Sequence, residues 1–360
     1  MTSSLESNKN ISTSRKSYLD VARGICMICI ILGHLGDPLI NRFVFTFHLP
    51  VFFLITGYFF NANDSFKNLL KSKARRLLVP YFFACICILI SYYSINTFIL
   101  HSNANNVSIW MKRIVKSAFL GAGDSWEKPF EIPGIGAIWF LWATFWGSII
   151  LYFLLKLSPI KRTLIIVGLF ILARWSVNNI GFIPLSIQPG CSAVLFMYIG
   201  YLWRNNEETL KKLPISVKAI SAVIASLLWI EFIRHFTSFW LVHSDYGQGF
   251  FDVVASIGAS ALVLAISYAL DKKCGRLLNP IKMIGQYSII ALCGHIIEMN
   301  SFPWGDIVNR VLGEDAPYVK AIYLKILLKL CWVFLFTFIL SRFGVTRRIF
   351  GLKAGKNGKK

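Results

Sequence analysis

Long apolar stretches, each separated from the next by a short polar segment, run through the sequence from residue 19 to residue 343. A helix needs about 20 mostly apolar residues to cross the hydrocarbon layer of a bilayer. Ten stretches approach that length and predict spans near residues 19–36, 43–62, 78–100, 135–156, 163–178, 189–203, 214–235, 250–270, 281–299 and 321–343. The pattern therefore predicts an all-α fold, a polytopic membrane bundle of about ten transmembrane helices.

The composition supports a chain surrounded by lipid. Of its 360 residues, 56% are hydrophobic and 15% are charged, and 30 Phe, 13 Tyr and 11 Trp provide lipid-facing and interfacial side chains. The net charge of +21 would alone suit a nucleic-acid binder. A composition this apolar, however, does not give a water-facing surface. We therefore expect membrane lipid, and no nucleic acid, as a partner.

Basic residues are distributed unevenly between alternate loops. With the N-terminus assigned to the cytoplasm, the cytoplasmic segments contain 26 of the 38 Lys and Arg residues, and the opposite loops contain 9. Because positive loops stay in the cytoplasm, we expect both termini there, in a multi-pass protein of the inner (cytoplasmic) membrane. We divide the chain into a disordered tail (1–17), a transmembrane domain (18–345) and a basic tail (346–360), and expect segment 101–134 to be an external loop with irregular backbone.

The first span contains three polar side chains that a bilayer disfavours. Asp20 and Arg23 are three residues apart, so they share a helical face and can form an ion pair. Arg23 and His34 are eleven residues apart, which returns to nearly the same face about 16 Å further along the helix. The Asp20–Arg23 pair alone would also suit an interfacial anchor. His34 follows an apolar run in which it contributes nothing to insertion, so it indicates a function.

Two more histidines are expected at the depth of His34. His48 begins the second span and His295 lies near the end of the ninth, which puts all three imidazoles toward the outer face. Further polar groups are expected at the outer ends of the spans. Each alone suits a solvated helix end, but together they outline a polar vestibule, and we take four as candidates for binding an acceptor: Glu131, Trp139, Arg174 and Glu298.

A basic cluster, Lys73, Arg75 and Arg76, leads into the third span. Cytoplasmic loops are commonly basic, but guanidinium groups also bind phosphate in a bidentate manner, so the cluster is a candidate site for a phosphate-rich ligand. The eight cysteines lie in or beside apolar spans, where a thiol acts as a small hydrophobic group. The pair Cys26 and Cys29 lacks a second pair, and we expect no metal.

Five short motifs follow one another between residues 19 and 295. They are Leu19-Asp20-x-x-Arg23-Gly24 with His34 ten residues further on, Phe47-His48-x-Pro50-x-Phe52-Phe53-x-x-x-Gly57-Tyr58, Arg76-x-x-x-Pro80-Tyr81, Trp139-Phe140-Leu141, and Gly285-x-x-Ser288 leading to His295. In this order and spacing the sequence resembles the acyltransferase family 3 integral membrane proteins, in particular the branch related to fucose 4-O-acetylases. Relatives often have two arginines three apart in the third motif, whereas here Lys73 replaces the first.

The resemblance implies an O-acyltransferase. Its donor would be cytoplasmic acetyl-CoA, and its acceptor a sugar hydroxyl of a cell-envelope glycan (O-antigen, capsule or exopolysaccharide) or of a lipid-linked precursor. By position, Arg23 and His34 match the Arg/His pair of the family. Residues expected to bind the nucleotide phosphates are Asp20, Arg23, Lys73, Arg75 and Arg76. Lysine cannot make the bidentate contact of arginine, which weakens this role at Lys73.

The chemistry of acyl transfer agrees with this assignment. A sugar hydroxyl is a weak nucleophile until a base accepts its proton, and an imidazole titrates near neutral pH. We predict that His34 is the general base, and that His48 or His295 orients it or stabilises the oxyanion.

Two other functions fit part of the pattern. A proton-coupled transporter would also contain His, Asp and Arg within its spans, but transporters often consist of repeated halves, and no repeat is visible here. A noncatalytic scaffold or sensor has no need for three histidines at one depth.

Overall fold

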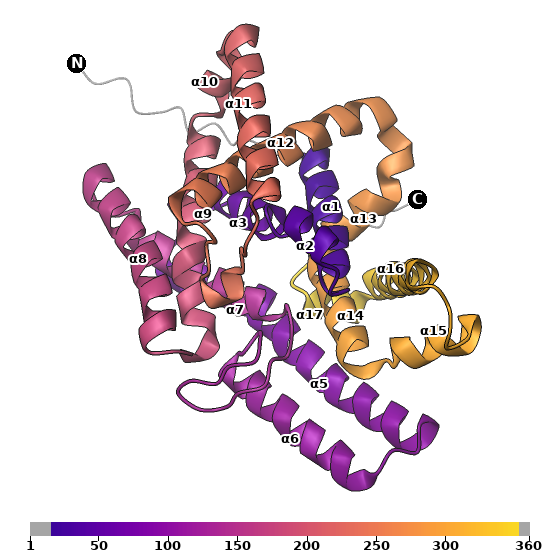
Figure 1. The fold of residues 1–360 in the computed structure, drawn as a ribbon. Coiled ribbons are helices and arrows are strands. Elements are labelled where there is room, and N and C mark those ends of the chain that lie inside the picture. Colours follow the sequence, from indigo (N-terminus) through magenta and orange to yellow (C-terminus); the bar gives the residue numbers. More distant parts are fainter. Residues whose placement is uncertain (1–15, 353–360) are drawn as a thin grey trace, which may run out of the picture.

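The computed structural model describes residues 16–352, which are helical for most of their length (Figure 1). In chain order the α-helices are α1 (Ser17–Gly33), α2 (Pro38–Val44), α3 (His48–Tyr58), α4 (Phe66–Lys73), α5 (Val79–Ser94), α6 (Ala104–Leu120), α7 (Trp139–Leu154), α8 (Pro159–Asn179), α9 (Ile187–Asn205), α10 (Glu207–Lys212), α11 (Ile215–Arg234), α12 (Phe250–Cys274), α13 (Asn279–Gln286), α14 (Ser288–Ser301), α15 (Trp304–Leu312), α16 (Tyr318–Arg342) and α17 (Gly344–Ile349). Residues 16–352 contain no strand, and Trp126 and Ile132 form one isolated bridge. The all-α prediction is confirmed. Most of the N-terminal tail and the end of the basic C-terminal tail lie outside the described residues.

Six helical segments of the described chain are long and apolar enough to cross a membrane. They are Pro38–Tyr58, Phe66–Ile99, Pro184–Asn205, Ile215–Arg234, Phe250–Gln286 and Tyr318–Arg342. The four other predicted spans also form helices, but α1 and α7 are only 17 and 16 residues long, α8 carries charges, and α13 and α14 are separate helices. A polytopic helical membrane protein is therefore confirmed, whereas the count of ten and the cytoplasmic location of the termini stay predictions.

The second predicted span, 43–62, is interrupted. Asp37 caps the short helix α2 by accepting hydrogen bonds from the Leu39 and Ile40 amides, and Pro38 occupies its first turn. The chain then turns at residues 45–47 before α3 begins at His48. At this turn the Thr46 hydroxyl donates to the Phe43 carbonyl, 2.6 Å away. The Phe47 amide bonds to the Val44 carbonyl instead of to that of Phe43, so the Thr46 hydroxyl satisfies the carbonyl that the interrupted helix leaves free.

A π-helical turn, η1 (Ala74–Leu78), joins α4 to α5 and contains Arg75 and Arg76. Proline has no amide hydrogen, so Pro80 cannot bond to the carbonyl of Arg76, four residues earlier. The Val79 amide instead donates to the Ala74 carbonyl, five residues back. The wider turn changes the direction of neighbouring side chains, and only Arg76 of the two arginines faces the cavity described below.

The glycines and prolines of segment 101–134 predict an irregular backbone, but only its second half is irregular. Its first half forms α6, which Asn103 caps and which lies beside α5 as a helical hairpin (Figure 1). The helix ends at Gly121, whose φ of 67° is in the left-handed region that suits glycine. Residues 121–138 then form the irregular part. Because α6 is amphipathic, its sequence contains no long apolar stretch of the kind that predicts a span.

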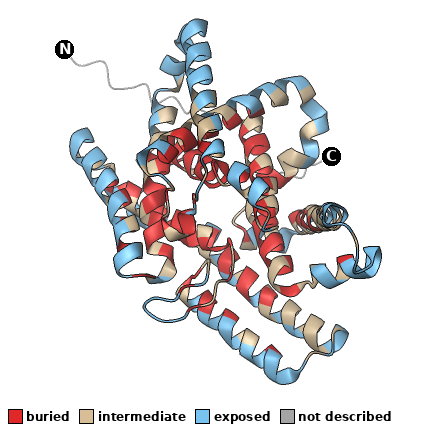
Figure 2. Ribbon diagram, viewed as in Figure 1, coloured by how far each residue is buried: buried red, intermediate tan, exposed pale blue. Residues whose placement is uncertain are grey.

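Helix α1 lies in the middle of the bundle, against α3, α12 and α13, where buried residues are concentrated (Figures 1 and 2). Two glycines allow α1 and α13 to approach closely. A Cβ atom on Gly285 would lie 1.7 Å from the Asp20 carbonyl oxygen, and one on Gly24 would lie 2.2 Å from that of Ile281. Small residues allow such backbone contact between membrane helices. The contact fixes α1 beside the break between α13 and α14.

We therefore expect Gly285→Ala to destabilise the protein. The added methyl group meets backbone, which cannot rotate away, so the cost should reach or exceed the roughly 1–3 kcal/mol typical of overpacking. Thermal unfolding of the purified protein in detergent measures the effect. Gly168→Ala on α8 is the matched control, because no atom lies within 4 Å of its added Cβ. An unchanged melting temperature for Gly285→Ala would contradict the close packing of α1 on α13.

Candidate active site

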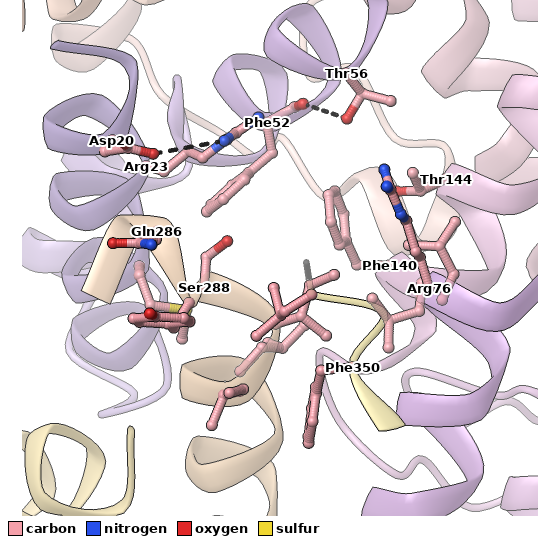
Figure 3. Close-up of a pocket in the computed structure, with 18 of the residues that line it drawn as sticks. Asp20, Arg23, Phe52, Thr56, Arg76, Phe140, Thr144, Gln286, Ser288 and Phe350 are labelled. Carbon is pink, nitrogen blue, oxygen red and sulfur yellow. Dashed lines mark hydrogen bonds and ion pairs between the residues drawn. The ribbon is translucent and has the colours of Figure 1, made fainter. Parts of the chain in front are cut away.

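A cavity of about 550 Å³ lies inside the bundle beside α1 (Figure 3). Along α1 its wall extends from Lys16 to Ile30, a rise of roughly 21 Å. The opposite wall comes from α3, η1, α7 and the start of α14, and residues 350–352, after α17, complete it. Phe350 is buried against this wall, and Gly351, at φ 61°, lies next to the Arg76 side chain. The cavity is thus formed by segments from both ends of the chain.

Basic groups outnumber acidic groups in the cavity. Lys16, Arg23 and Arg76 line it, and Asp20 is the acidic residue among its lining residues. Arg23 and Asp20 form the ion pair that their spacing predicts, with 3.8 Å between Nη1 and Oδ1. The cavity wall therefore carries a net positive charge. Further along α1, Met27 and Ile30 make it apolar, so one end suits an anion and the other a neutral chain.

The break between α13 and α14 opens onto the same cavity. Gln286, Tyr287 and Ser288 all line it, and α14 starts at Ser288 (Figure 3). The first amides of a helix have no partner within the helix and carry a partial positive charge. Broken membrane helices use such ends to bind anionic or polar groups. The α14 terminus thus adds to the positive character that Arg23 and Arg76 establish.

His34 and His295 are in direct contact. Their ring centroids are 5.1 Å apart and the rings meet edge to face. Along α1 the cavity wall reaches Ile30, one helical turn before His34. The Ile30 carbonyl accepts a hydrogen bond from the His34 ring, which connects the two residues. His34 itself is partly exposed, whereas His295 is completely buried. His48 is buried as well, and its ring contacts Phe45.

Hydrogen bonds define the proton positions on all three imidazoles. Nδ1 of His34 lies 2.8 Å from the Ile30 oxygen, and Nδ1 of His48 lies 2.5 Å from the Val44 oxygen. A carbonyl oxygen only accepts, so each Nδ1 carries the hydrogen, and in the neutral ring Nε2 has the lone pair. Nδ1 of His295 likewise donates to the Glu298 carboxylate at 2.7 Å. Its buried Nε2 has no hydrogen-bond partner among the described residues.

Glu298 is completely buried and both of its carboxylate oxygens are occupied. Oε1 accepts from His295, and the Lys329 ammonium lies 2.8 Å from each oxygen. The Trp304 indole nitrogen donates to Oε2. Three elements, α14, α15 and α16, therefore converge on one carboxylate, which in turn orients the His295 ring toward His34.

A second imidazole–carboxylate pair joins two loops. His243 on the turn η4 (Leu241–His243) lies 3.0 Å from Asp124, and its ring contacts that of Trp126 at a tilt of 50°. Burial raises the pKa of the Asp124 carboxyl, but hydrogen bonds from His243 and the Ser125 amide, together with the charges of His243 and His34, lower it below its usual range. The pair links the irregular segment before α7 to the loop between α11 and α12.

The residues predicted from the sequence to bind the donor fall into two sets. Asp20, Arg23 and Arg76 line the cavity together. Arg75 is exposed, and Lys73 lies over the Phe60 ring, 5.8 Å from its centroid; neither belongs to the cavity wall.

The four residues selected for acceptor binding have different surroundings. Glu131 is 81% exposed and pairs with Arg113 at 3.6 Å. Trp139 is buried beneath Gly123, and Arg174 forms an ion pair with Asp245. Glu298 belongs to the buried carboxylate site described above. No group of three or more potential metal ligands occurs among residues 16–352.

Lys329 and Glu207 are polar residues that the sequence did not assign to a site. Lys329 lies in the middle of an apolar span, a position where a charge needs a partner, so its location was a detectable signal. Glu207 lies between two predicted spans, where acidic residues are common and do not indicate a site. Its partners come from three other segments, and only the folded structure brings them together.

The fold and the cavity define a polytopic helical membrane protein with a positively charged internal site. The family model described as "Acyltransferase domain" (Acyl_transf_3) matches residues 16–343, so the chain belongs to acyltransferase family 3. The nodulation protein NolL of Mesorhizobium japonicum is 24% identical over 294 residues, which are 74% of this chain and 70% of that relative. No solved structure matches the chain significantly. The family resemblance of the motifs is confirmed.

Lys329→Met should be strongly destabilising, because it leaves the Glu298 carboxylate buried without its ammonium partner. The loss expected for such a change is about 3–5 kcal/mol. The double variant Glu298→Gln with Lys329→Met removes both charges and should regain most of the lost stability. Lys325→Met, one turn earlier on α16, is the control, because Lys325 forms no ion pair in the described chain. Thermal unfolding in detergent compares the variants, and equal losses in the single and double variants would argue against a coupled pair.

Proposed function

We propose that this protein transfers an acetyl group from cytoplasmic acetyl-CoA to a sugar hydroxyl of a cell-envelope glycan or of its lipid-linked precursor. The observation that carries the proposal is the contact of His34 with His295, one helical turn beyond the apolar end of a cavity whose other end is basic. Membership of acyltransferase family 3 supplies the reaction class. The protein acts in the inner membrane with both termini in the cytoplasm.

The donor enters with its nucleotide at the basic end of the cavity. Arg23 and Arg76 attract its phosphates, and arginine suits this task because its guanidinium binds phosphate with two parallel hydrogen bonds. Asp20 holds Arg23 in position through their ion pair. The apolar stretch past Met27 accepts the pantetheine arm, and the thioester at its end reaches the level of Ile30, one turn from His34.

His34 acts as the general base. Its Nδ1 hydrogen bonds to the Ile30 carbonyl, which leaves the Nε2 lone pair available for the hydroxyl proton. The hydroxyl oxygen attacks the thioester carbonyl, the carbon–sulfur bond breaks, and the leaving thiolate takes the proton from the imidazolium. His34 is partly exposed, so an acceptor that arrives from outside can reach it.

His295 and Glu298 support the charged form of His34. When His34 accepts a proton, the neighbouring His295 ring offers the lone pair of Nε2, and Glu298 provides negative charge behind it. A carboxylate that orients an imidazole and stabilises a cation in this way is common in acyl transfer. In this proposal Glu298 is a positioning residue and does not contact the acceptor. Glu131, Trp139 and Arg174 remain the candidates for acceptor binding.

His34→Ala should abolish acetylation while donor binding is retained. Loss of a general base reduces the rate by about 10² to 10⁴. Mass spectrometry of envelope glycans from cells with and without the protein detects the mass of one acetyl group. His235→Ala is the control, since the His235 imidazole is exposed and pairs with Glu231, away from the site. Retained acetylation in His34→Ala would transfer the role of base to another residue.

An assay with the purified protein in liposomes separates this function from proton-coupled transport. Purified protein that moves a solute across liposomes in a pH-dependent manner, yet transfers nothing from acetyl-CoA, would favour the transporter.

A further inference from the structure

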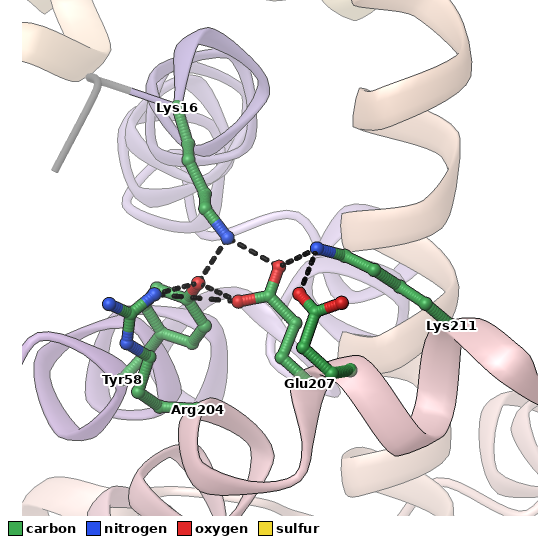
Figure 4. A network of polar contacts seen from close by, with 6 residues as sticks. Lys16, Tyr58, Arg204, Glu207 and Lys211 are labelled. Atoms are coloured by element: carbon green, nitrogen blue, oxygen red, sulfur yellow. Dashed lines mark hydrogen bonds and ion pairs between the residues drawn. The ribbon is translucent and has the colours of Figure 1, made fainter. Parts of the chain in front are cut away.

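A polar cluster surrounds Glu207 where three helices end (Figure 4). The Glu207 cluster consists of Lys16, Tyr58, Arg204, Glu207 and Lys211. The Lys16 ammonium lies 2.5 Å from Glu207 Oε1, Lys211 lies 3.2 Å from the same oxygen, and Arg204 lies 3.5 Å from Oε2. The Tyr58 hydroxyl bonds to Glu207 and accepts hydrogen bonds from Lys16 and Arg204. Three cations thus share one carboxylate.

The cluster borders the basic end of the cavity. Lys16 belongs both to the cluster and to the cavity wall, so any ligand that fills this end of the cavity meets an ammonium group that now binds Glu207. The Glu207 side chain is only 13% exposed. Burial alone raises the pKa of its carboxyl, but hydrogen bonds from Lys16, Tyr58 and Lys211 outweigh this effect and lower the pKa to about 2. The position favours a negative charge.

We infer that the Glu207 cluster is a binding site for the terminal phosphate of the acyl donor, and that Glu207 occupies this site when no donor is present. The inference rests on the proposed donor, acetyl-CoA. One carboxylate neutralises one of the three cations, and Lys211 also pairs with the exposed Glu208 at 2.8 Å. A phosphate carries more charge and more acceptor oxygens than a carboxylate, so it competes with Glu207 for Lys16 and Arg204.

The dimensions of the cavity agree with this arrangement. Lys16 precedes Arg23 by seven residues, or about 10 Å along α1, and precedes Ile30 by about 21 Å. A donor whose thioester lies near Ile30 therefore places its diphosphate near Arg23 and Arg76. The phosphate on its ribose, at the far end of the molecule, then lies beside Lys16. Dephospho-CoA lacks only this phosphate and is the matching probe.

The test is equilibrium binding of CoA and dephospho-CoA to the full-length protein in nanodiscs. Wild-type protein should bind CoA at least about tenfold more tightly, as expected for charge-assisted hydrogen bonds. Lys16→Met should remove most of this preference and leave the affinity for dephospho-CoA unchanged. Glu207→Gln should have the opposite effect, a severalfold tighter binding of CoA alone, because the competing carboxylate is gone. Lys212→Met, an exposed position on the same short helix, is the control and should behave as wild type.

Each contrary result has a distinct meaning. If both Lys16→Met and Glu207→Gln weaken the two ligands alike, the cluster is structural and the inference is wrong. If the wild-type protein binds both ligands equally well, the inference is wrong but the donor proposal stands. If it binds neither ligand, the donor proposal fails, and the inference fails with it.

Discussion

The buried ion pair between Glu298 and Lys329 constrains the rest of the site. A carboxylate without solvent exposure in an apolar bundle is stable only if its charge and its hydrogen bonds are satisfied. Lys329, His295 and Trp304 satisfy them here, and this requirement fixes α14 against α15 and α16. Because α14 also begins at the cavity, its 14 residues connect the two parts of the site. Ser288 lies at the cavity wall at one end of the helix, and His295 lies against His34 two turns further on. Any shift of the ion pair along the helix axis would therefore move both.

Helix α1 provides the complementary half of this arrangement. It begins directly after Lys16, carries Arg23 and ends at the turn of His34, so a single helix sets the spacing between the basic end of the cavity and His34, the proposed base. The contact of Gly24 and Gly285 with opposing backbone brings this helix next to the α13–α14 break. In the proposed mechanism, the relative positions of donor and base thus depend on helix packing more than on loops. This is consistent with the precision of geometry that an acyl transfer between two bound substrates requires.

Much of the helical architecture follows from the sequence, because long apolar stretches are local signals. The spacing of Asp20, Arg23 and His34 on one helix was equally readable, and the structure has Asp20 and Arg23 in the same cavity wall and His34 one turn beyond its end. Contacts between distant segments were not readable. The periodicity of α16 could not show that Lys329 meets Glu298, and a run of basic residues could not show that the π-turn before Pro80 directs Arg76, rather than Arg75, into the cavity. The helix α6 was not predicted either, because it is amphipathic and lacks the uniformly apolar stretch that predicts a span.

Glu298 and Glu207 are both carboxylates with several partners, but they differ in whether another anion could take their place. Glu298 has no exposed surface, and Lys329 provides one ammonium group for its one negative charge. Removing either leaves an uncompensated charge in the bundle, so this pair has no reason to open. Glu207 lies at the end of a cavity, among three cations that a single carboxylate cannot neutralise. An anion that enters from the cavity could replace it without leaving any cation unpaired, and the displaced Glu207, in the first turn of α10, could be hydrated. On the inference drawn above, the same interaction between carboxylate and ammonium stabilises the fold at one end of the site and holds the other end ready for a ligand.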